Sequence, residues 1–392
     1  MTKTNNRLSV MEILLIIYLF IGMMSASIFN YSRYVISLII QLRCFFFLKN
    51  KPLKEFLLPI ASYLGIFVIG VTFVIIDVPT SDLINRILPL FSIFGLTWLK
   101  VYKDNLRFDR VIEIVIRLYK YLGILIIIDA AVYGVSGYGI WKPIIFLSYR
   151  FSGPFYDSNY MGMLYVFLIL VCRFGFPRKR NISTIAIFMI IWALSGSWSA
   201  LIIGLFVWIV CSIFTVKRLF LKQIIILFVY FLLSLWIFNG RGAAESFFAK
   251  TVSVILPFDS EHLIAKFNSL FIRIDTQINA IILSFKNGFV GFGPRTILKY
   301  FEHDTHNSFV AMLFELGAAG FLLLLINMPL RTNSKLSDAA STFVILSALV
   351  LDIHYTIIYS FLILFIVFEK NLSLNPYAKK KLLSGAEVCM AG

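Results

Sequence analysis

Long apolar runs recur along the whole chain and limit what it can fold into. A run of about 18–25 mostly apolar residues is typical of a transmembrane helix, whereas a membrane β-barrel is built from alternating segments of about 10 residues, which the sequence lacks. The sequence therefore predicts an all-α, polytopic integral membrane protein with about 12 transmembrane helices. The predicted spans are 10–29, 33–48, 56–76, 84–101, 111–133, 157–175, 182–196, 199–215, 221–239, 306–327, 339–352 and 355–369. The last two are short, and a hairpin that does not fully cross is the alternative.

Composition agrees with a membrane protein. Of the 392 residues, 60% are hydrophobic and 14% charged, against about 45–50% and 25% in soluble domains. The net charge of +16 is explained by Lys and Arg that retain loops on the cytoplasmic side, so no nucleic acid is expected as a partner. None of the cysteines falls in a predicted outer loop, so no disulfide is expected; they are Cys44, Cys172, Cys211 and Cys389.

Charge asymmetry orients the predicted spans. With the N-terminus in the cytoplasm, every second gap carries a basic cluster, such as Lys103, Arg107 and Arg110, while short outer gaps carry Asp77 and Asp82. A cleaved signal peptide is the alternative for the first run, but an even number of spans fits the charges better. We expect a bacterial inner-membrane protein with both termini cytoplasmic. Its predicted parts are a bundle of nine spans (1–239), a periplasmic loop (240–305), the C-terminal spans (306–372) and a tail (373–392).

The long loop contains an amphipathic helix. Apolar residues recur at helical spacing from Phe267 to Phe285, and Arg273 and Gln277 lie four apart on a different face. We expect this helix to lie along the bilayer surface. The run 288–294, Gly-Phe-Val-Gly-Phe-Gly-Pro, ends it in a turn, and Arg295 follows.

Polar residues gather at the outer ends of the spans. They lie in four places: Arg150–Asn159, Ser195–Ala200, Arg273 with Gln277, and His303–Asn307. His306 and Asn307 stand at the start of an apolar run. If this run is one continuous helix with about 100° of rotation per residue, Gly317 lies about 20° around the helix axis from His306, and Gly320 lies within about 40° of it. Small residues there let a neighbouring helix approach and fix the imidazole. The alternative is a histidine that only marks the water interface.

Charged residues inside spans usually face a bundle interior or a cavity. Glu315 lies about 180° from His306 on a continuous helix, so we assign it to helix packing. Asp129 lies near the outer end of its span and is a candidate for lining the site.

These motifs together resemble the superfamily of O-antigen ligases and O-antigen polymerases over about residues 145–325. Arg150, Gly153 and Asn159 match an Arg-x-x-Gly-x-x-x-x-x-Asn element, and Ser195–Ser199 matches a Ser-x-Ser turn in which Trp198 stands where the family often has Arg. The external loop matches through Arg273, Gly291 and Gly293. A His-Asn, nine residues, Gly-x-x-Gly pattern is matched by His306, Asn307, Gly317 and Gly320.

The resemblance implies a glycosyltransferase that uses a glycan on undecaprenyl diphosphate at the periplasmic face. Arginine binds phosphate oxygens through a permanently charged fork and stabilises charge on a leaving diphosphate. Arg150 and Arg273 are the first candidates for this contact, with Arg241 and Arg295 behind them; Asn159, Asn307 and Gln277 are further substrate-binding candidates. His306 matches the position of the base that activates the attacking sugar hydroxyl.

Other groups near His306 leave alternatives open. His303 lies three residues earlier, Asp304 is suited to orient either imidazole, and His354 is a more remote candidate base. His303, Asp304, His306 and Asp259 are also candidate metal ligands. No predicted outer loop has an Asp-x-Asp pair, and the arginines already neutralise the charge of the diphosphate, so no metal and no cofactor are expected.

The resemblance favours an O-antigen polymerase that joins repeat units and extends the chain at its reducing end. An O-antigen ligase, which passes the glycan to lipid A-core, shares the donor and is the alternative. A flippase or other transporter for lipid-linked oligosaccharides is the third candidate, although it should carry its charged and helix-breaking residues near the midplane. The implied partners are the lipid-linked glycan as donor and acceptor, membrane lipid, a chain-length regulator and a flippase.

Overall fold

The computed structural model describes most of the chain as helices. The described residues are 8–22, 24, 27–47, 51–141, 144–146, 148–155, 157–176, 181–213, 219–240, 242, 246, 260–294, 296–301, 306–327, 334–350 and 357–372. The longer helices are α1 (Val10–Ile21), α2 (Ser27–Phe45), α3 (Leu57–Ile75), α4 (Thr80–Phe94), α6 (Phe108–Ser136), α7 (Ser158–Gly175), α8 (Ile182–Ser195), α9 (Trp198–Ile213), α10 (Leu219–Asn239), α12 (Ser260–Lys286), α14 (Ser308–Ile326), α15 (Lys335–Val350) and α16 (Ile357–Leu372). Shorter elements are η2 (Leu53–Glu55), η3 (Gly95–Trp98), α5 (Leu99–Tyr102), η4 (Lys103–Asn105), α13 (Thr296–Phe301) and the antiparallel strands β1 (Ile144–Phe146) and β2 (Ser148–Arg150).

Each predicted apolar run overlaps a helix, so the prediction of a helical fold is confirmed. Within the described residues, four helical stretches are long and apolar enough to cross a membrane, as expected of a membrane protein: Leu57–Ile75, Thr80–Asn105, Ser158–Gly175 and Ser308–Ile326. The predicted amphipathic segment is also helical, as α12.

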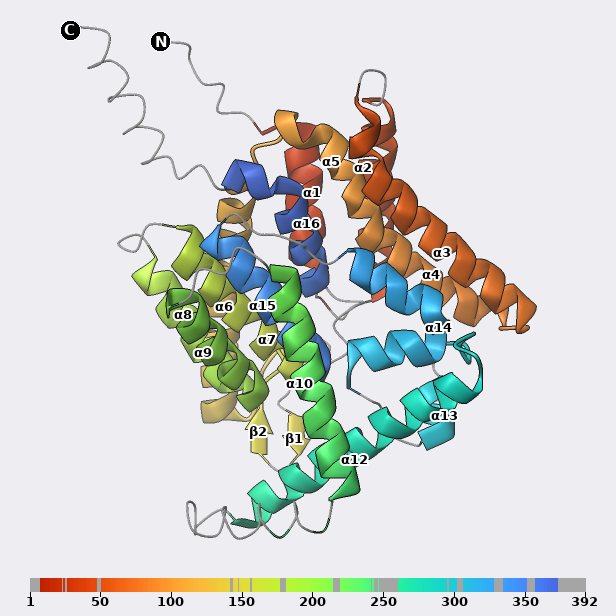
Figure 1. Ribbon diagram of the computed structural model, residues 1–392. Coiled ribbons are helices and arrows are strands. Elements are labelled where there is room, and N and C mark those ends of the chain that lie inside the picture. The colour runs from red at the N-terminus through yellow and green to blue at the C-terminus, as the bar shows by residue number, and fades with distance from the viewer. Residues whose placement is uncertain are drawn as a thin grey trace, which may run out of the picture.

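The helices form two groups that α16 joins. In Figure 1, α2, α3 and α4 lie on one side of the molecule and α6, α8 and α9 on the other, while α5 lies at the end opposite to α12 and the two strands. The C-terminal helix α16 packs against α4, α6 and α15. Tyr18 of α1 strengthens this junction, because its buried hydroxyl is 3.3 Å from Ser92 Oγ of α4 and 3.0 Å from Ser360 Oγ of α16.

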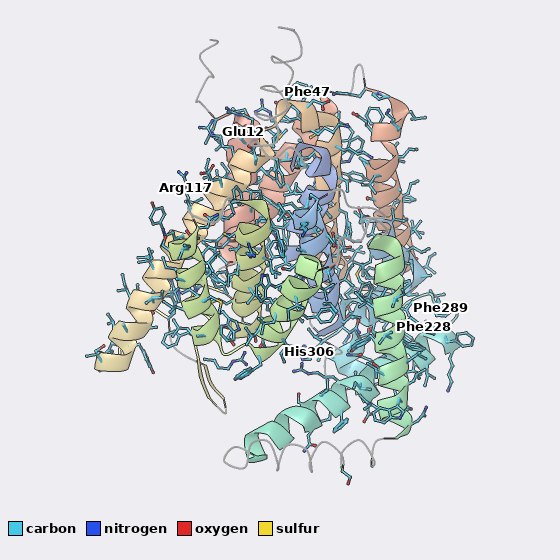
Figure 2. The ribbon with its side chains drawn as sticks, turned by 60° about the vertical axis from the view of Figure 1, so that its left-hand side comes forward. Glu12, Phe47, Arg117, Phe228, Phe289 and His306 are labelled. Atoms are coloured by element: carbon cyan, nitrogen blue, oxygen red, sulfur yellow. The ribbon has the colours of Figure 1, made fainter. Side chains whose placement is uncertain are left out.

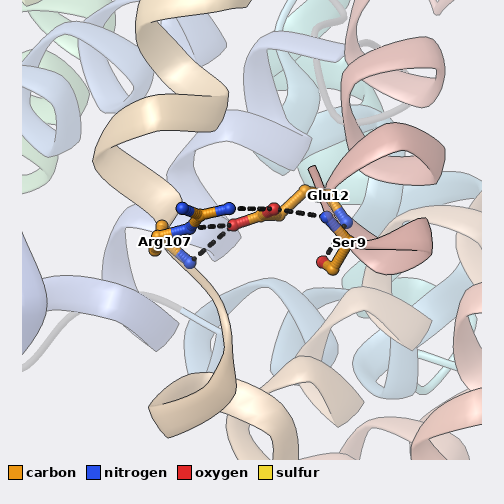
Figure 3. Close-up of polar contacts among 3 residues, drawn as sticks. All are labelled: Ser9, Glu12 and Arg107. Carbon is orange, nitrogen blue, oxygen red and sulfur yellow. Dashed lines mark hydrogen bonds and ion pairs between the residues drawn. The ribbon is translucent and has the colours of Figure 1, made fainter. Parts of the chain in front are cut away.

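A capping box and an ion pair fasten the first helix to α6 (Figure 3). The Glu12 backbone N–H donates to Ser9 Oγ (3.2 Å), and the Ser9 backbone N–H donates to Glu12 Oε2 (2.7 Å). Arg107 also donates hydrogen bonds to both oxygens of the same carboxylate, from Nε (2.9 Å) and from Nη2 (3.1 Å). Since Glu12 is only 1% exposed, its negative charge depends on this bidentate partner.

Helix α14 is broken at Gly317, where φ is 69° and ψ is −163°. A break inside an apolar helix leaves backbone donors and acceptors without helical partners, and burial makes this costly. Here the glycine-rich turn that follows α12 supplies the partners. The bonds run from Phe292 N to Phe314 O (2.9 Å), from Gly293 N to Glu315 O (3.0 Å) and from Ala318 N to Phe289 O (2.8 Å).

The expectation of one continuous helical face from His306 to Gly320 is therefore wrong. Counting about 100° per residue requires an unbroken helix, but His306 lies before the first helical residue with φ of 46° and Gly317 interrupts the helix. The close neighbour of Gly317 is the loop backbone, because a Cβ atom there would overlap the carbonyl oxygens of Phe289 and Val290. A Cβ on Gly320 would meet Leu316 of the same helix.

Candidate functional site

Arg150 is the centre of a polar cluster at the start of α7. Its Nε donates to the Ser195 carbonyl oxygen (3.0 Å), and its Nη2 donates to Asn159 Oδ1 (2.6 Å). Asp157 caps α7 by accepting from the Asn159 backbone N–H (2.5 Å). Burial lowers the pKa of the Arg150 guanidinium, and the nearby Asp157 carboxylate opposes that shift. Arginine stays protonated in proteins, so Arg150 keeps its positive charge.

This cluster unites the two motifs predicted at the outer ends of α7 and α8. Phe151 N donates to Leu194 O at 3.0 Å, which ties the segment after Arg150 to the end of α8. The turn at Gly196 has φ of 61°, a left-handed conformation suited to glycine. Gly162 of α7 allows the close approach, because a Cβ atom there would lie 2.6 Å from Ser195 Oγ.

A second polar cluster joins α10, α12 and the start of α14. Tyr230 donates from its hydroxyl to Gln277 Oε1 (2.8 Å), with the Leu349 carbonyl also within reach (3.2 Å). Asn307 donates from Nδ2 to the same Gln277 oxygen (3.4 Å), and its own Oδ1 caps α14 by accepting from two backbone N–H groups. The predicted binding residues Gln277 and Asn307 are thus brought together, and both side chains are buried.

His306 and Arg273 lie at the edge of this second cluster. Figure 2 shows His306 in the half of the molecule opposite to Glu12, beside α12. His306 is partly buried and adopts φ of 46°, a conformation that is uncommon for a residue other than glycine and that clusters at functional sites. Arg273 lies one turn before Gln277 on α12.

The two clusters are linked across the last turns of α15. Met163 lies one turn after Asn159 on α7, and Ser347 Oγ donates to its sulfur at 3.4 Å. Two residues further on, Leu349 is within hydrogen-bonding reach of Tyr230 in the second cluster. The helices α7 and α10, which carry Asn159 of the first cluster and Tyr230 of the second, therefore both contact the last turns of α15.

Several predicted site residues lie outside the described residues. They are Arg241, Arg295, His303, Asp304, His354 and Asp259. Of the four candidate metal ligands only His306 is described, and among the described residues no group of three or more His, Cys, Asp or Glu side chains could hold a metal ion.

Two carboxylates that the sequence places inside predicted spans, Glu315 and Asp129, have structural partners. Glu315 is paired with Arg86 of α4 at 3.2 Å, so it contacts another helix, as its assignment to packing requires. Asp129 accepts from the backbone N–H groups of Ile140 (2.6 Å) and Trp141 (3.0 Å), so its carboxylate anchors the segment after α6.

Sequence reasoning missed Tyr230, Gly162 and Met163. Each lies within an apolar run where its residue type is ordinary, so no local pattern singles it out. Only the packing of α7, α10 and α15 gives them their roles. No protein-family model, curated protein or solved structure matches this chain.

Proposed function

We propose that this protein is a membrane glycosyltransferase of the O-antigen polymerase type, which joins repeat units carried on undecaprenyl diphosphate. The observation that carries the proposal is the pair of polar clusters on helices that contact the last turns of α15. One holds a partly buried cation, Arg150, and the other holds the amides of Gln277 and Asn307, the second of which follows His306 in the chain. An anion-binding group, amide groups and a base are the parts that transfer from a diphosphate requires.

In this mechanism the donor's diphosphate lies in the membrane interface against Arg150 and Arg273. Their guanidinium groups neutralise the charge that develops as the bond between the sugar anomeric carbon and the diphosphate oxygen breaks. His306 accepts the proton of the acceptor hydroxyl as its oxygen bonds to the anomeric carbon. Asn307 fixes the backbone beside His306 by capping α14.

The proposal includes the topology inferred from charge. The apolar helices form about 12 spans in the bacterial inner membrane, α12 belongs to the periplasmic loop, and the site faces the periplasm. The separation seen in Figure 1 supports this, because α5 and α12 lie at opposite ends of the molecule. Lys100 and Lys103 lie at the α5 end, where the positive-inside rule requires the cytoplasm.

The break in α14 at Gly317 makes a transporter an alternative to be considered. Transporters use discontinuous helices whose free backbone groups bind substrates or ions near the midplane. In α14, however, the turn at 289–293 bonds to the backbone groups of Phe314, Glu315 and Ala318. The break is filled by protein, which favours transferase over transporter.

A lipopolysaccharide gel from a strain that lacks the protein tests the proposal. Lipid A-core that carries a single repeat unit is the expected result for a polymerase. Bare core with polymer accumulating on undecaprenyl diphosphate would instead identify a ligase. An unchanged ladder would overturn both transferase assignments.

A further inference from the structure

Arg33 of α2 is a buried cation that none of the motifs includes. It is 5% exposed. Its Nη1 donates to the Gly22 carbonyl oxygen (3.1 Å), its Nη2 donates to the Tyr34 hydroxyl (3.3 Å), and its guanidinium carbon lies 5.0 Å from the Tyr34 ring centre. Among the described residues, Arg33 Nε is buried without a hydrogen-bond acceptor.

The charge of Arg33 is also unbalanced within the described part of the chain. The ion pairs there join Lys51, Arg86, Lys103, Arg107 and Arg117 to carboxylates, and none includes Arg33. A buried charge is costly unless it is both paired and hydrogen-bonded. A guanidinium that retains a free N–H donor and a full positive charge is suited to bind an anion.

The surroundings of Arg33 connect it to the candidate site. Gly22, its backbone partner, ends α1, and Met24 two residues later pairs with Phe155 in an antiparallel β-bridge. Phe155 belongs to the segment between Arg150 and Asn159. Met24 therefore lies beside the segment that contains the first polar cluster.

We propose that Arg33 is a further anion-binding residue of this site and takes a phosphate oxygen of a membrane lipid, namely the diphosphate of the glycan donor. This inference rests on the proposed function, because it assigns the anion to that donor. Arg33 lies on α2 and Arg150 at the end of β2. In this proposal the two cations therefore reach one diphosphate from different elements and contact different oxygens of it.

The test is binding of farnesyl diphosphate to the purified full-length protein in detergent, with farnesol and phosphatidylglycerol as separate probes. Arg33→Gln removes the charge, and we expect it to weaken farnesyl diphosphate binding about tenfold or more while leaving farnesol unaffected. Arg117→Gln is the matched control, since Arg117 is an exposed arginine paired within its own helix. It should bind the diphosphate like the wild type.

Arg33→Lys keeps the positive charge but not the planar fork, and it replaces Arg33→Gln if the latter does not fold. Weaker diphosphate binding by the lysine variant, at an unchanged melting temperature, supports the proposal.

If both Arg33 variants bind farnesyl diphosphate with wild-type affinity while Arg150→Gln binds it weakly, the role of Arg33 is overturned but the proposed transferase function is not. Loss of phosphatidylglycerol binding alone would assign Arg33 to a structural lipid and overturn the donor contact. Equal affinity of the wild type for farnesol and farnesyl diphosphate would count against the proposed function itself.

Discussion

The backbones of Gly291 and Gly317 pack directly against each other, so that a Cβ atom on Gly291 would lie 2.7 Å from Gly317 N. Both residues have positive φ, at 94° and 69°. This contact joins the turn after α12 to the break in α14. It thereby fixes the half-helix that begins at Ser308 relative to the helix that carries Gln277.

Gly317→Ala is expected to destabilise the protein strongly. With ψ of −163°, Gly317 occupies a region that is almost restricted to glycine, which costs other residues about 1–3 kcal/mol before the overlap with the turn is counted. Gly70→Ala in α3 is the control, because a Cβ there meets nothing within 4 Å. It should be neutral or stabilising by up to about 1 kcal/mol. Thermal unfolding in detergent compares the two, and equal melting temperatures would show that the break does not depend on Gly317.

Tyr230→Phe is expected to loosen the second cluster. The change removes the donor to Gln277 Oε1 and leaves a buried acceptor less satisfied, at a cost of about 1–3 kcal/mol. Tyr121→Phe is the matched control, since Tyr121 is 63% exposed. Chemical or thermal unfolding measures both variants. A Tyr230→Phe protein as stable as its control would mean that the Tyr230 hydrogen bond makes no net contribution.

Arg107→Gln is expected to lower the melting temperature more than the double change Glu12→Gln with Arg107→Gln. The single variant leaves the buried Glu12 carboxylate without its bidentate partner, whereas the double variant removes both charges. Hydrogen bonding to Glu12 raises the pKa of Arg107, so this pair is present throughout the pH range in which the carboxylate is ionised. A double variant less stable than the single one would contradict this account.

His306→Asn is expected to abolish glycan polymerisation while the protein still folds. Asparagine tolerates the left-handed conformation at φ of 46° but provides no base, so loss of activity reports the imidazole and not the backbone. Removal of a general base costs about 10²–10⁴-fold in rate. The lipopolysaccharide ladder and the amount of membrane-inserted protein are measured together. A normal ladder would remove His306 from the mechanism.

Arg150→Glu is expected to impair donor use more than Arg150→Lys. Lysine retains the charge but not the fork that reaches both Ser195 O and Asn159 Oδ1, whereas glutamate repels the diphosphate. The apparent KM for the lipid-linked donor separates them, with melting temperatures measured in parallel. Equal KM values in both variants and the wild type would argue against diphosphate binding at Arg150.

The sequence by itself determined that the chain is mostly helical and that each apolar run overlaps a helix. Apolar runs and the helical spacing within α12 depend on residues near each other in the chain, so periodicity alone reveals them. The glycine-rich turn at 288–294 was likewise visible in the sequence. The family resemblance placed Arg150 and Asn159 in one sequence motif, but it did not predict the hydrogen bond between their side chains.

Only the tertiary structure decided how these pieces meet. Gly317 breaks α14 because the backbone of a distant turn satisfies the groups that the break exposes, and Tyr230 gains a role because α12 and α15 reach it. Arg33 is notable only because packing buries it. Hydrogen bonds and burial between residues far apart in sequence leave no local period, so they emerge only when the helices pack.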